Sequence, residues 1–252
     1  MRSSEKVGIV TGGSRNVGRT ITEALVEMGF MVYICSRTLG ELEKTRQDLK
    51  NVKTHQLDLN DRDRIFEWVE EIIQECGRVD VLVNNAAVMT PLGSFLENPL
   101  DEWFETVKSN LMGTVTFTKA VLPQMIEQGG GHIINLGGGG SAYPRADHSA
   151  YASSKAAIVR FSDTLAEEVR EKNVKVNVLS PGKQYSKMRE QDREFGIRFP
   201  DEWDDREKVK ALTRFLVTTN ITGKFIHIND NYSSFTDDIM KSDLYTLRRI
   251  NP

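Results

Sequence analysis

Short runs of β-branched and other apolar residues alternate along this chain with longer segments of helical periodicity, and this alternation restricts the fold more than any other feature. It is typical of repeated βαβ units, in which helices connect parallel strands and cover the sheet. Continuous apolar runs such as Asp80-Val-Leu-Val favour strands that are covered on both faces. The predicted strands are Val7–Val10, Met31–Cys35, Lys53–Leu57, Val79–Val83, His132–Leu136, Lys175–Leu179 and Lys224–Ile228. The predicted helices are Gly18–Met28, Gly40–Leu49, Asp61–Cys76, Leu100–Gln128, Ser149–Glu171 and Glu207–Thr218.

This strict alternation leaves no room for a domain boundary. Residues 1–252 are therefore expected to form a single α/β domain, a doubly wound, Rossmann-type parallel seven-stranded sheet with helices on both faces. The composition, 39% hydrophobic and 27% charged, is ordinary for a globular protein. A formal net charge of -3 gives no electrostatic reason to expect nucleic acid or an anionic membrane as a partner. We expect a small-molecule substrate instead.

The two cysteines, Cys35 and Cys76, provide neither a disulfide framework nor the spacing of a zinc site, so no metal is expected. The first residues lead into a strand without the apolar core of a signal peptide, and no apolar run approaches the length of a membrane span. We therefore expect a cytoplasmic protein with reduced thiols.

Tyr151 and Lys155 lie four residues apart in a predicted helix, so their side chains share one face. A Lys charge held against a Tyr hydroxyl favours the phenolate and lowers a pKa that starts near about 10. Such a pair is suited to proton transfer with a substrate. The same spacing also occurs by chance on amphipathic helices, where it is a plain surface pair.

The first turn between strand and helix, Thr11 to Gly18, has the features of a phosphate cradle. Gly12 allows a tight turn, Gly18 allows the helix to pack close to the sheet, and the free amides at the helix start attract a phosphate. A glycine-rich turn can also be a simple connection, but the position after the first strand favours the cradle. The predicted contacts in this turn are Gly12, Ser14, Arg15, Asn16 and Val17.

Ser36 and Arg37 end the second strand, where a dinucleotide-binding fold contacts the adenine ribose. An acidic residue there would bind the ribose hydroxyls of NAD, whereas Arg37 offers a cationic fork that suits a 2′-phosphate. Arg15 could add a second positive charge. NADP(H) is therefore expected over NAD(H), the alternative being that Arg37 only caps a solvated loop.

Several motifs in register resemble those of the short-chain dehydrogenase/reductase family, in particular its keto-reductases related to β-ketoacyl carrier-protein reductase. The resemblance runs from Lys6 to about Phe225. Its motifs are Thr11-Gly12 through Gly18, Leu57-Asp58-Leu59, Asn84-Asn85-Ala86-Ala87, Asn110-Leu-Met-Gly, Tyr151 through Lys155, and Pro181-Gly182.

By this resemblance, Tyr151 exchanges a proton with the substrate, Lys155 lowers the pKa of Tyr151 and binds the nicotinamide ribose, and Asn110 holds a helix open for a water-linked proton relay. The cofactor contacts that it implies are Asp58, Leu59, Asn85, Ala86, Ala87, Pro181, Gly182 and Ser186. It thus implies an NADP(H)-dependent oxidoreductase that moves a hydride between nicotinamide and a carbonyl or hydroxyl group of a small polar substrate.

The chain departs from the family at the residue thirteen before Tyr151, where members carry a Ser and this chain has Gly138. Losing one donor of this kind costs about 10²- to 10³-fold in turnover. Ser141 could reach in if the loop Gly137–Gly140 folds back, and a backbone amide of Gly138 or Gly139, a substrate hydroxyl or a water are the alternatives. A cofactor-binding protein with weakened catalysis therefore stays open as a second function.

Four further features bear on the cofactor, the substrate and the assembly. Asn16 stands where the family usually has glycine, and asparagine tolerates left-handed backbone angles. Residues 183–205 are predicted to be a substrate lid; their mixed charge suggests a polar substrate such as a sugar or sugar nucleotide, although a solvated surface helix explains the same charges. Residues 229–252 form a polar C-terminal extension, so an acyl-carrier substrate is not assumed. The helices Leu100–Gln128 and Ser149–Glu171 resemble those of a four-helix subunit interface, so a homo-oligomer, a dimer or tetramer, is expected.

Overall fold

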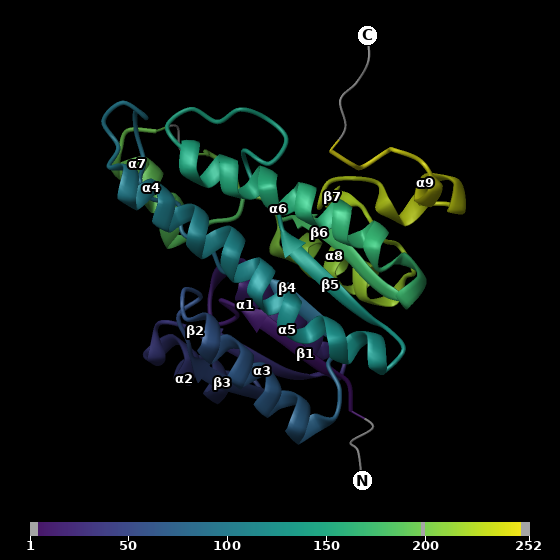
Figure 1. Cartoon of the computed structure of the whole chain (residues 1–252). Helices are drawn as coiled ribbons and strands as arrows, with labels where there is room; N and C mark the ends of the chain where they lie inside the picture. The colour runs from purple at the N-terminus through teal and green to yellow at the C-terminus, as the bar shows by residue number, and fades with distance from the viewer. Residues whose placement is uncertain (1–4, 198–199, 248–252) are drawn as a thin grey trace.

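The structure is a computed structural model in which residues 5–197 and 200–247 are described. Its strands form one seven-stranded sheet in the order β3-β2-β1-β4-β5-β6-β7, with every neighbouring pair parallel (Figure 1). The predicted single α/β domain with a doubly wound sheet is thereby confirmed. The strands are β1 (Val7–Thr11), β2 (Met31–Ser36), β3 (Val52–Gln56), β4 (Val81–Asn84), β5 (Gly131–Leu136), β6 (Val174–Ser180) and β7 (Phe225–His227).

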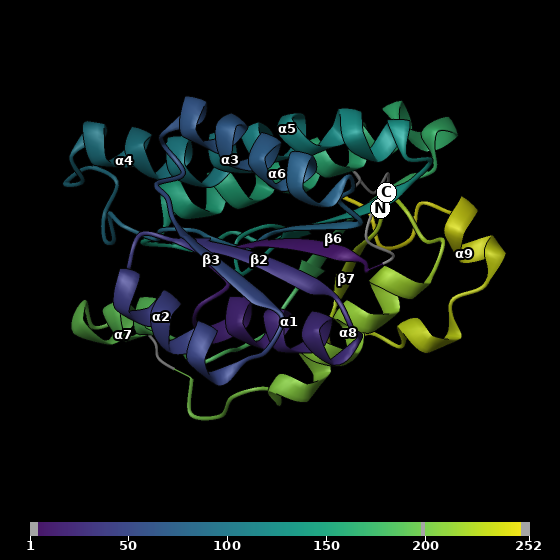
Figure 2. The same cartoon turned by 90° about the horizontal axis from the view of Figure 1, so that it is seen from below.

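Helices cover both faces of this sheet (Figure 2). One face carries α3 (Arg62–Cys76), α4 (Leu100–Val107), α5 (Gly113–Glu127) and α6 (Ser149–Glu168). The other face carries α1 (Asn16–Glu27), α2 (Leu39–Asp48), α7 (Lys187–Glu194) and α8 (Arg206–Thr218). The strand order reverses direction between β1 and β4, and in such sheets ligands bind outside the carboxyl ends of the strands at this point.

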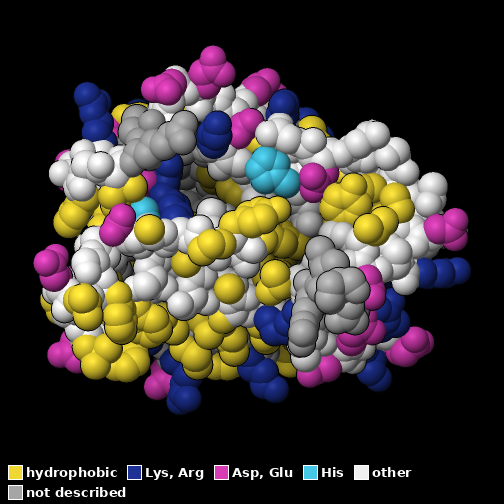
Figure 3. Space-filling model, turned by 90° about the horizontal axis from the view of Figure 1, so that it is seen from above, with side chains coloured by type: hydrophobic (Ala, Val, Ile, Leu, Met, Phe, Trp, Pro, Cys, Tyr) yellow, Lys and Arg dark blue, Asp and Glu magenta, His cyan; other side chains and the backbone are white. Residues whose placement is uncertain are grey.

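The outer surface of α4 and the segments near it carries large apolar side chains. Leu100 and Phe104 on α4 each expose 56% of their area, and Leu96 just before the helix exposes 94%. On the face of the molecule that Figure 3 shows, hydrophobic side chains gather at the lower left and lower centre of the view. A contiguous exposed apolar surface of this kind often marks a site of contact with another molecule, whereas single exposed apolar side chains are ordinary.

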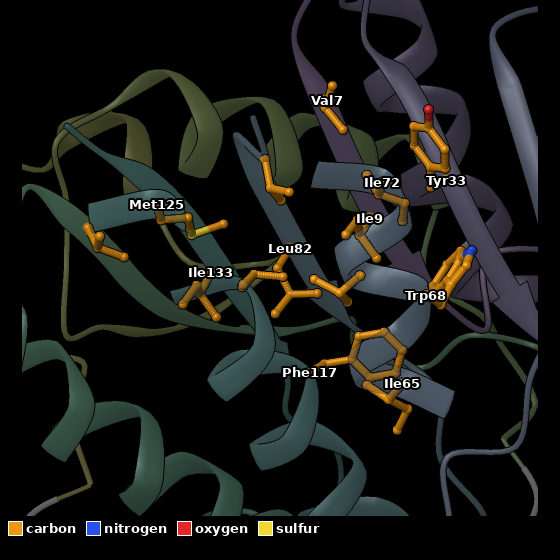
Figure 4. Packing of buried hydrophobic residues seen from close by; sticks show 14 of the residues in the cluster. Val7, Ile9, Tyr33, Ile65, Trp68, Ile72, Leu82, Phe117, Met125 and Ile133 are labelled. Atoms are coloured by element: carbon orange, nitrogen blue, oxygen red, sulfur yellow. The ribbon is translucent and has the colours of Figure 1, made fainter. Parts of the chain in front are cut away.

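Two apolar layers, one on each face of the sheet, form the core. Between the sheet and α3 and α5, the rings of Trp68 and Phe117 meet edge to face with centroids 6.1 Å apart, and Leu82 and Ile133 rise from the strands beside them (Figure 4). A second cluster lies under α1 and α8. Because both faces are buried, the strands need apolar residues at consecutive positions, which is why they read as continuous runs.

The structure differs from the predicted helices at three places. The predicted helix Leu100–Gln128 is interrupted by a π-helical turn, Lys108–Met112, and so divides into α4 and α5. Two short helices were not among the six predicted: α7, inside the predicted lid, where a solvated surface helix was the alternative interpretation, and α9 (Asp237–Lys241), inside the C-terminal extension. Both segments are short and strongly charged, so they lack the apolar stripe that identifies a helix from sequence.

The C-terminal extension lies against the edge of the sheet. The backbone N–H of Phe225 in β7 donates to the carbonyl oxygen of Tyr245 at 2.6 Å, and Lys224 Nζ donates to the carbonyl oxygens of Ser242 and Leu244 at 2.7 and 3.1 Å. Residues 248–252 of the predicted extension and residues 198–199 of the predicted lid lie outside the described residues. No helix in the described part of the chain has the length and apolar character needed to cross a membrane.

Candidate active site

The glycine-rich turn between β1 and α1 leaves room that a side chain would fill. Gly12 has a φ of 64° and Asn16 a φ of 49°, so the asparagine adopts the left-handed conformation that it tolerates. A Cβ on Gly18 would overlap the carbonyl oxygen of Gly12. The hydroxyl of Ser14 is buried and has no hydrogen-bond partner among the described residues. An unpartnered hydroxyl in a turn kept open by glycine fits the phosphate of a dinucleotide.

A cleft with a volume of about 230 Å³ opens beside this turn. It brings together sixteen of the seventeen predicted cofactor contacts, which lie after the carboxyl ends of different strands and in the first turns of α1 and α6. These are Gly12, Ser14, Arg15, Asn16, Val17, Ser36, Arg37, Asp58, Leu59, Asn85, Ala86, Ala87, Tyr151, Lys155, Pro181 and Ser186. Gly182 is the exception, because a Cβ at this position would face Asp204 Oδ2 at 2.5 Å instead of the cleft.

At the end of β2 the cleft is cationic. Arg37 is exposed and its guanidinium has no partner among the described residues, while its carbonyl oxygen accepts from Gln56 Nε2 at 2.9 Å. Arg15, half exposed, lies 3.6 Å from Glu41. The Ser36 hydroxyl is taken by the backbone N–H of Thr38 at 3.0 Å. Ser36 and Arg37, the described residues at the end of β2, thus offer no carboxylate to ribose hydroxyls.

Asn85 fastens β4 to β1 at the floor of the cleft. Its Nδ2 donates to the carbonyl oxygens of Thr11 at 2.9 Å and Gly12 at 3.2 Å, and the Thr11 hydroxyl accepts from the backbone N–H groups of Asn85 and Ala86, both at 3.0 Å. Asn85 thus holds the glycine turn in place with its amide, in addition to lining the cleft.

Tyr151 and Lys155 lie in the first turns of α6 and both reach the cleft. Lys155 Nζ donates to the carbonyl oxygen of Leu136 at 2.8 Å and lies 5.7 Å from the centroid of the Tyr151 ring. Burial lowers the pKa of Lys155 from 10.5 to about 8. The side chains share one helix face, as the four-residue spacing predicted.

The electrostatics of Tyr151 differ from the prediction. Burial raises the pKa of Tyr151, and the cations that oppose this are Arg145 and Arg189, not Lys155; Asp192 raises the pKa further. Because the Lys155 ammonium is held at the Leu136 carbonyl, it is not aimed at the hydroxyl of Tyr151 in this state.

Gly138 lies directly against Tyr151. A Cβ built on Gly138 would be 2.8 Å from Tyr151 Oη, so the phenol occupies the space that a side chain at 138 would need. Ser141 does not line the cleft: it is buried, its Oγ accepts from the Gly138 N–H at 3.0 Å, and its own N–H donates to the Gly138 carbonyl at 3.0 Å. The Gly138 N–H is therefore already bonded to Ser141. Of the two backbone amides considered as donors to the substrate oxygen, only that of Gly139 remains.

Asn110 lies in the π-helical turn, buried behind the cleft. Its Oδ1 accepts from the Val88 N–H at 2.8 Å, and its Nδ2 donates to the Val88 carbonyl at 2.9 Å and to Ser154 Oγ at 3.0 Å. The helix is thus widened at the residue for which the family resemblance implied an opening.

Four ionisable residues near Tyr151 were missed by the sequence reasoning. Asp192 on α7 is 0% exposed and accepts from Arg145 Nη2 at 2.9 Å and from Arg189, while His148 Nε2 lies 2.7 Å from its other oxygen. Arg145 and His148 precede Asp192 by more than forty residues, so only the Arg189–Asp192 spacing was visible in the sequence. Met188, on the same helix, also lines the cleft and was not predicted.

Comparison with known proteins agrees with this geometry. A family model described as short chain dehydrogenase matches residues 6–195. The 3-oxoacyl-[acyl-carrier-protein] reductase FabG of Thermotoga maritima is 31% identical over 242 residues, covering 91% of this chain and 98% of that protein. The NADP-dependent 3-hydroxy acid dehydrogenase YdfG of Escherichia coli O6:H1 is 31% identical over 175 residues, covering 69% of this chain and 71% of that protein.

Among solved structures, a metagenomic short-chain oxidoreductase in complex with NADP is similar with a TM-score of 0.74 and 27% identity, covering 85% of this chain and 90% of that one. The match of the family model extends from β1 through α7 and so includes the glycine turn, Tyr151 and Lys155. The chain belongs to the short chain dehydrogenase family and is an NAD(P)-dependent oxidoreductase that acts on C=O or CH–OH groups.

Proposed function

We propose that this enzyme uses NADP(H) and transfers a hydride between the nicotinamide and the carbonyl or hydroxyl carbon of a small polar substrate. The observation that carries the proposal is the convergence of Tyr151 and Lys155 with the glycine turn on one cleft. The relatives named above support the same cofactor and reaction type, since two of the three carry NADP in their names or titles.

The side chains divide the work as follows. A bound nicotinamide would supply or accept the hydride. Tyr151 donates its proton to the carbonyl oxygen in reduction and takes it back in oxidation. Lys155 uses one of its three N–H donors on the Leu136 carbonyl, so two remain to hold ribose hydroxyls. The cations that assist loss of the Tyr151 proton are Arg145 and Arg189.

Replacing Tyr151 tests the reaction. Tyr151→Phe removes the proton donor and is expected to lower NADPH-dependent reduction by about 10²- to 10⁴-fold, the usual contribution of a general acid, while NADPH still binds. Tyr143→Phe is the matched control, because Tyr143 is 80% exposed in the same loop region and does not line the cleft. Unchanged turnover in Tyr151→Phe would move the proton transfer to another group.

The cofactor preference rests on Arg37. A charge-assisted hydrogen bond contributes about 1.5–3 kcal/mol, so Arg37→Gln is expected to weaken NADPH binding by about 10- to 100-fold and to leave NADH binding within about threefold. Arg46→Gln, an exposed change on α2 away from the cleft, is the control. Equal losses for both nucleotides, measured by fluorescence titration, would mean that Arg37 does not read the 2′-phosphate.

A second candidate function, a cofactor-binding protein with weak catalysis, is favoured by one specific arrangement. Position 138 carries no hydroxyl, its amide is used by Ser141, and Tyr151 is only 8% exposed. NADPH binding by the wild-type protein without reduction of any carbonyl in a broad panel would select this alternative.

We further propose that residues 183–205 cover the substrate. The ends of the segment are tied together, because the Lys183 N–H donates to Asp204 Oδ2 at 2.7 Å and the Asp204 N–H donates to the Lys183 carbonyl at 2.9 Å. From the segment between them, Met188 and Ile197 pack against the small apolar cluster that includes Tyr151. Opening of this segment would expose the phenol, and its closure would exclude water from the reacting groups.

The exposed apolar surface around α4 supports assembly into a homo-oligomer, a dimer or tetramer. Leu100, Phe104 and Leu96 form part of this surface, which water contacts in the isolated chain. Sedimentation velocity of the wild type and of Phe104→Glu would test it. A smaller species is expected for the variant, and a monomeric wild type would contradict the proposal.

A further inference from the structure

The charged cluster beside Tyr151 contains more positive than negative groups. Two guanidinium groups, those of Arg145 and Arg189, share one oxygen of Asp192, and His148 contacts the other oxygen at 2.7 Å. Arg145, Arg189 and Asp192 are the charged groups that act on Tyr151. Two cations thus face one carboxylate in a region where both guanidinium side chains are only 21% exposed. A partly buried excess of positive charge favours an additional anion.

Arg145 and Tyr151 lie against neighbouring positions of the loop Gly137–Gly140, which carries no side chains. A Cβ on Gly138 would lie 2.8 Å from Tyr151 Oη, and a Cβ on Gly139 would lie 3.2 Å from Arg145 Nη1. Two consecutive glycines therefore let a phenol and a guanidinium approach neighbouring positions of one loop. A serine at 138 would compete with the phenol for this space.

The guanidinium groups have donors left for a ligand. Each has five N–H donors in a planar fork. Among the described residues, the hydrogen bonds and ion pairs of the Arg145 side chain go to Asp192 alone. Asp192 is fully buried and holds both forks in position from the lid helix. A planar fork with free donors matches the paired oxygens of a carboxylate or phosphate.

We propose that Arg145, together with Arg189, binds an anionic group of the substrate, a carboxylate or a phosphate, and so directs the enzyme to carbonyl or alcohol substrates that carry such a group. This inference rests on the proposed function and narrows its substrate class. Arg145 takes over the anchoring of the substrate at the position where the glycine loop supplies no hydroxyl. Asp192 is a positioning residue, since it acts through the two arginines.

The test compares matched charged and neutral probes. Levulinate is paired with methyl levulinate, and dihydroxyacetone phosphate with dihydroxyacetone. Binding to the enzyme with saturating NADP⁺ is measured by calorimetry, and reduction with NADPH is measured separately. In the wild type, at least one charged probe is expected to bind about 10- to 100-fold more tightly than its neutral partner, which is the range for charge-assisted hydrogen bonds. The pair that shows the preference distinguishes a carboxylate from a phosphate.

Arg145→Gln is expected to abolish this preference, and Arg145→Lys to restore part of it. Arg62→Gln is the matched control, because Arg62 is 76% exposed at the start of α3 and pairs only with Asp63 among the described residues. Thermal unfolding shows whether Arg145→Gln is folded. If the cluster only fastened the lid, the variant would weaken charged and neutral probes equally. That result, or charged probes that bind no better than their partners to the wild type, would overturn the inference.

Loss of the anion site and loss of the oxidoreductase reaction would give different experimental results. Reduction of neutral ketones that depends on Tyr151, without any preference for charged probes, would leave the oxidoreductase reaction standing and remove the anion site. Tight binding of a charged probe that depends on Arg145, without reduction of any carbonyl, would leave the anion site standing and remove the proposed reaction.

Discussion

Gly138→Ala tests whether the missing side chain is what allows Tyr151 to hold its position. The added Cβ would lie 2.8 Å from Tyr151 Oη, whereas ordinary contacts begin at 3.4 Å, so the hydroxyl has to move by about 0.6 Å. The φ of Gly138 lies outside the left-handed region, so alanine is compatible with the backbone. Because a misplacement of about 1 Å can cost about 100-fold in rate, we expect kcat to fall by about 10- to 30-fold.

The assay follows NADPH consumption with a reducible carbonyl substrate, and NADPH binding is measured in parallel. Binding should change little, since the added methyl group faces the phenol. Gly40→Ala is the control, because a Cβ there meets nothing within 4 Å. Gly138→Ser adds a hydroxyl to the same Cβ, so a higher kcat for serine than for alanine would measure what the hydroxyl contributes. A wild-type kcat in Gly138→Ala would refute the argument that Tyr151 depends on the empty position.

Two further changes probe the cofactor turn and the buried ammonium. Gly18→Ala places a Cβ on the Gly12 carbonyl oxygen, so we expect a loss of about 1–3 kcal/mol in the free energy of unfolding and much weaker NADPH binding; a variant with unchanged melting temperature and affinity would contradict this. Burial lowers the pKa of Lys155 from 10.5 to about 8. Above pH 10.5 the amine is neutral in both the folded and the unfolded chain, so its charge does not lower the free energy of unfolding there. The penalty grows as the pH falls below 10.5 and is nearly complete below pH 8, at about 3 kcal/mol. Lys155→Met removes this penalty but also removes the hydrogen bond to the Leu136 carbonyl. We therefore expect the free energy of unfolding, measured with a denaturant at pH 7, to rise by about 1–2 kcal/mol. The variant is expected to have no activity. This gain should shrink as the pH approaches 10.5, and a gain independent of pH would mean that the buried charge is not its cause.

The parts of the fold that were predictable are those whose signal is local. Strands covered on both faces require apolar residues at consecutive positions, so all seven were recognised from short runs, with their ends displaced by one or two residues. The gathering of most predicted cofactor contacts around one cleft was predictable for a related reason. Most of them follow soon after a strand or lie in the first turns of a helix, and parallel strands bring those positions to one edge.

The parts that could not be predicted depend on contacts between distant segments or on side-chain direction. The charged cluster joins Arg145 to Asp192 across 47 positions, and no short pattern reports that pairing. The spacing of Tyr151 and Lys155 predicted a shared helix face, but not that the ammonium would be directed to the Leu136 carbonyl. The π-helical turn at Asn110 depends on Val88 and Ser154, which lie in other elements.

The contact between the C-terminal extension and β7 has a consequence for solubility. A strand at the end of a sheet presents backbone donors and acceptors that can recruit a strand from another molecule. In β7 the donor of Phe225 is matched by the Tyr245 carbonyl, and the Lys224 ammonium fastens the extension alongside. The extension therefore covers the edge strand β7 and hinders the addition of a strand from another molecule. A chain shortened before Ser242 would leave β7 exposed as a template for aggregation.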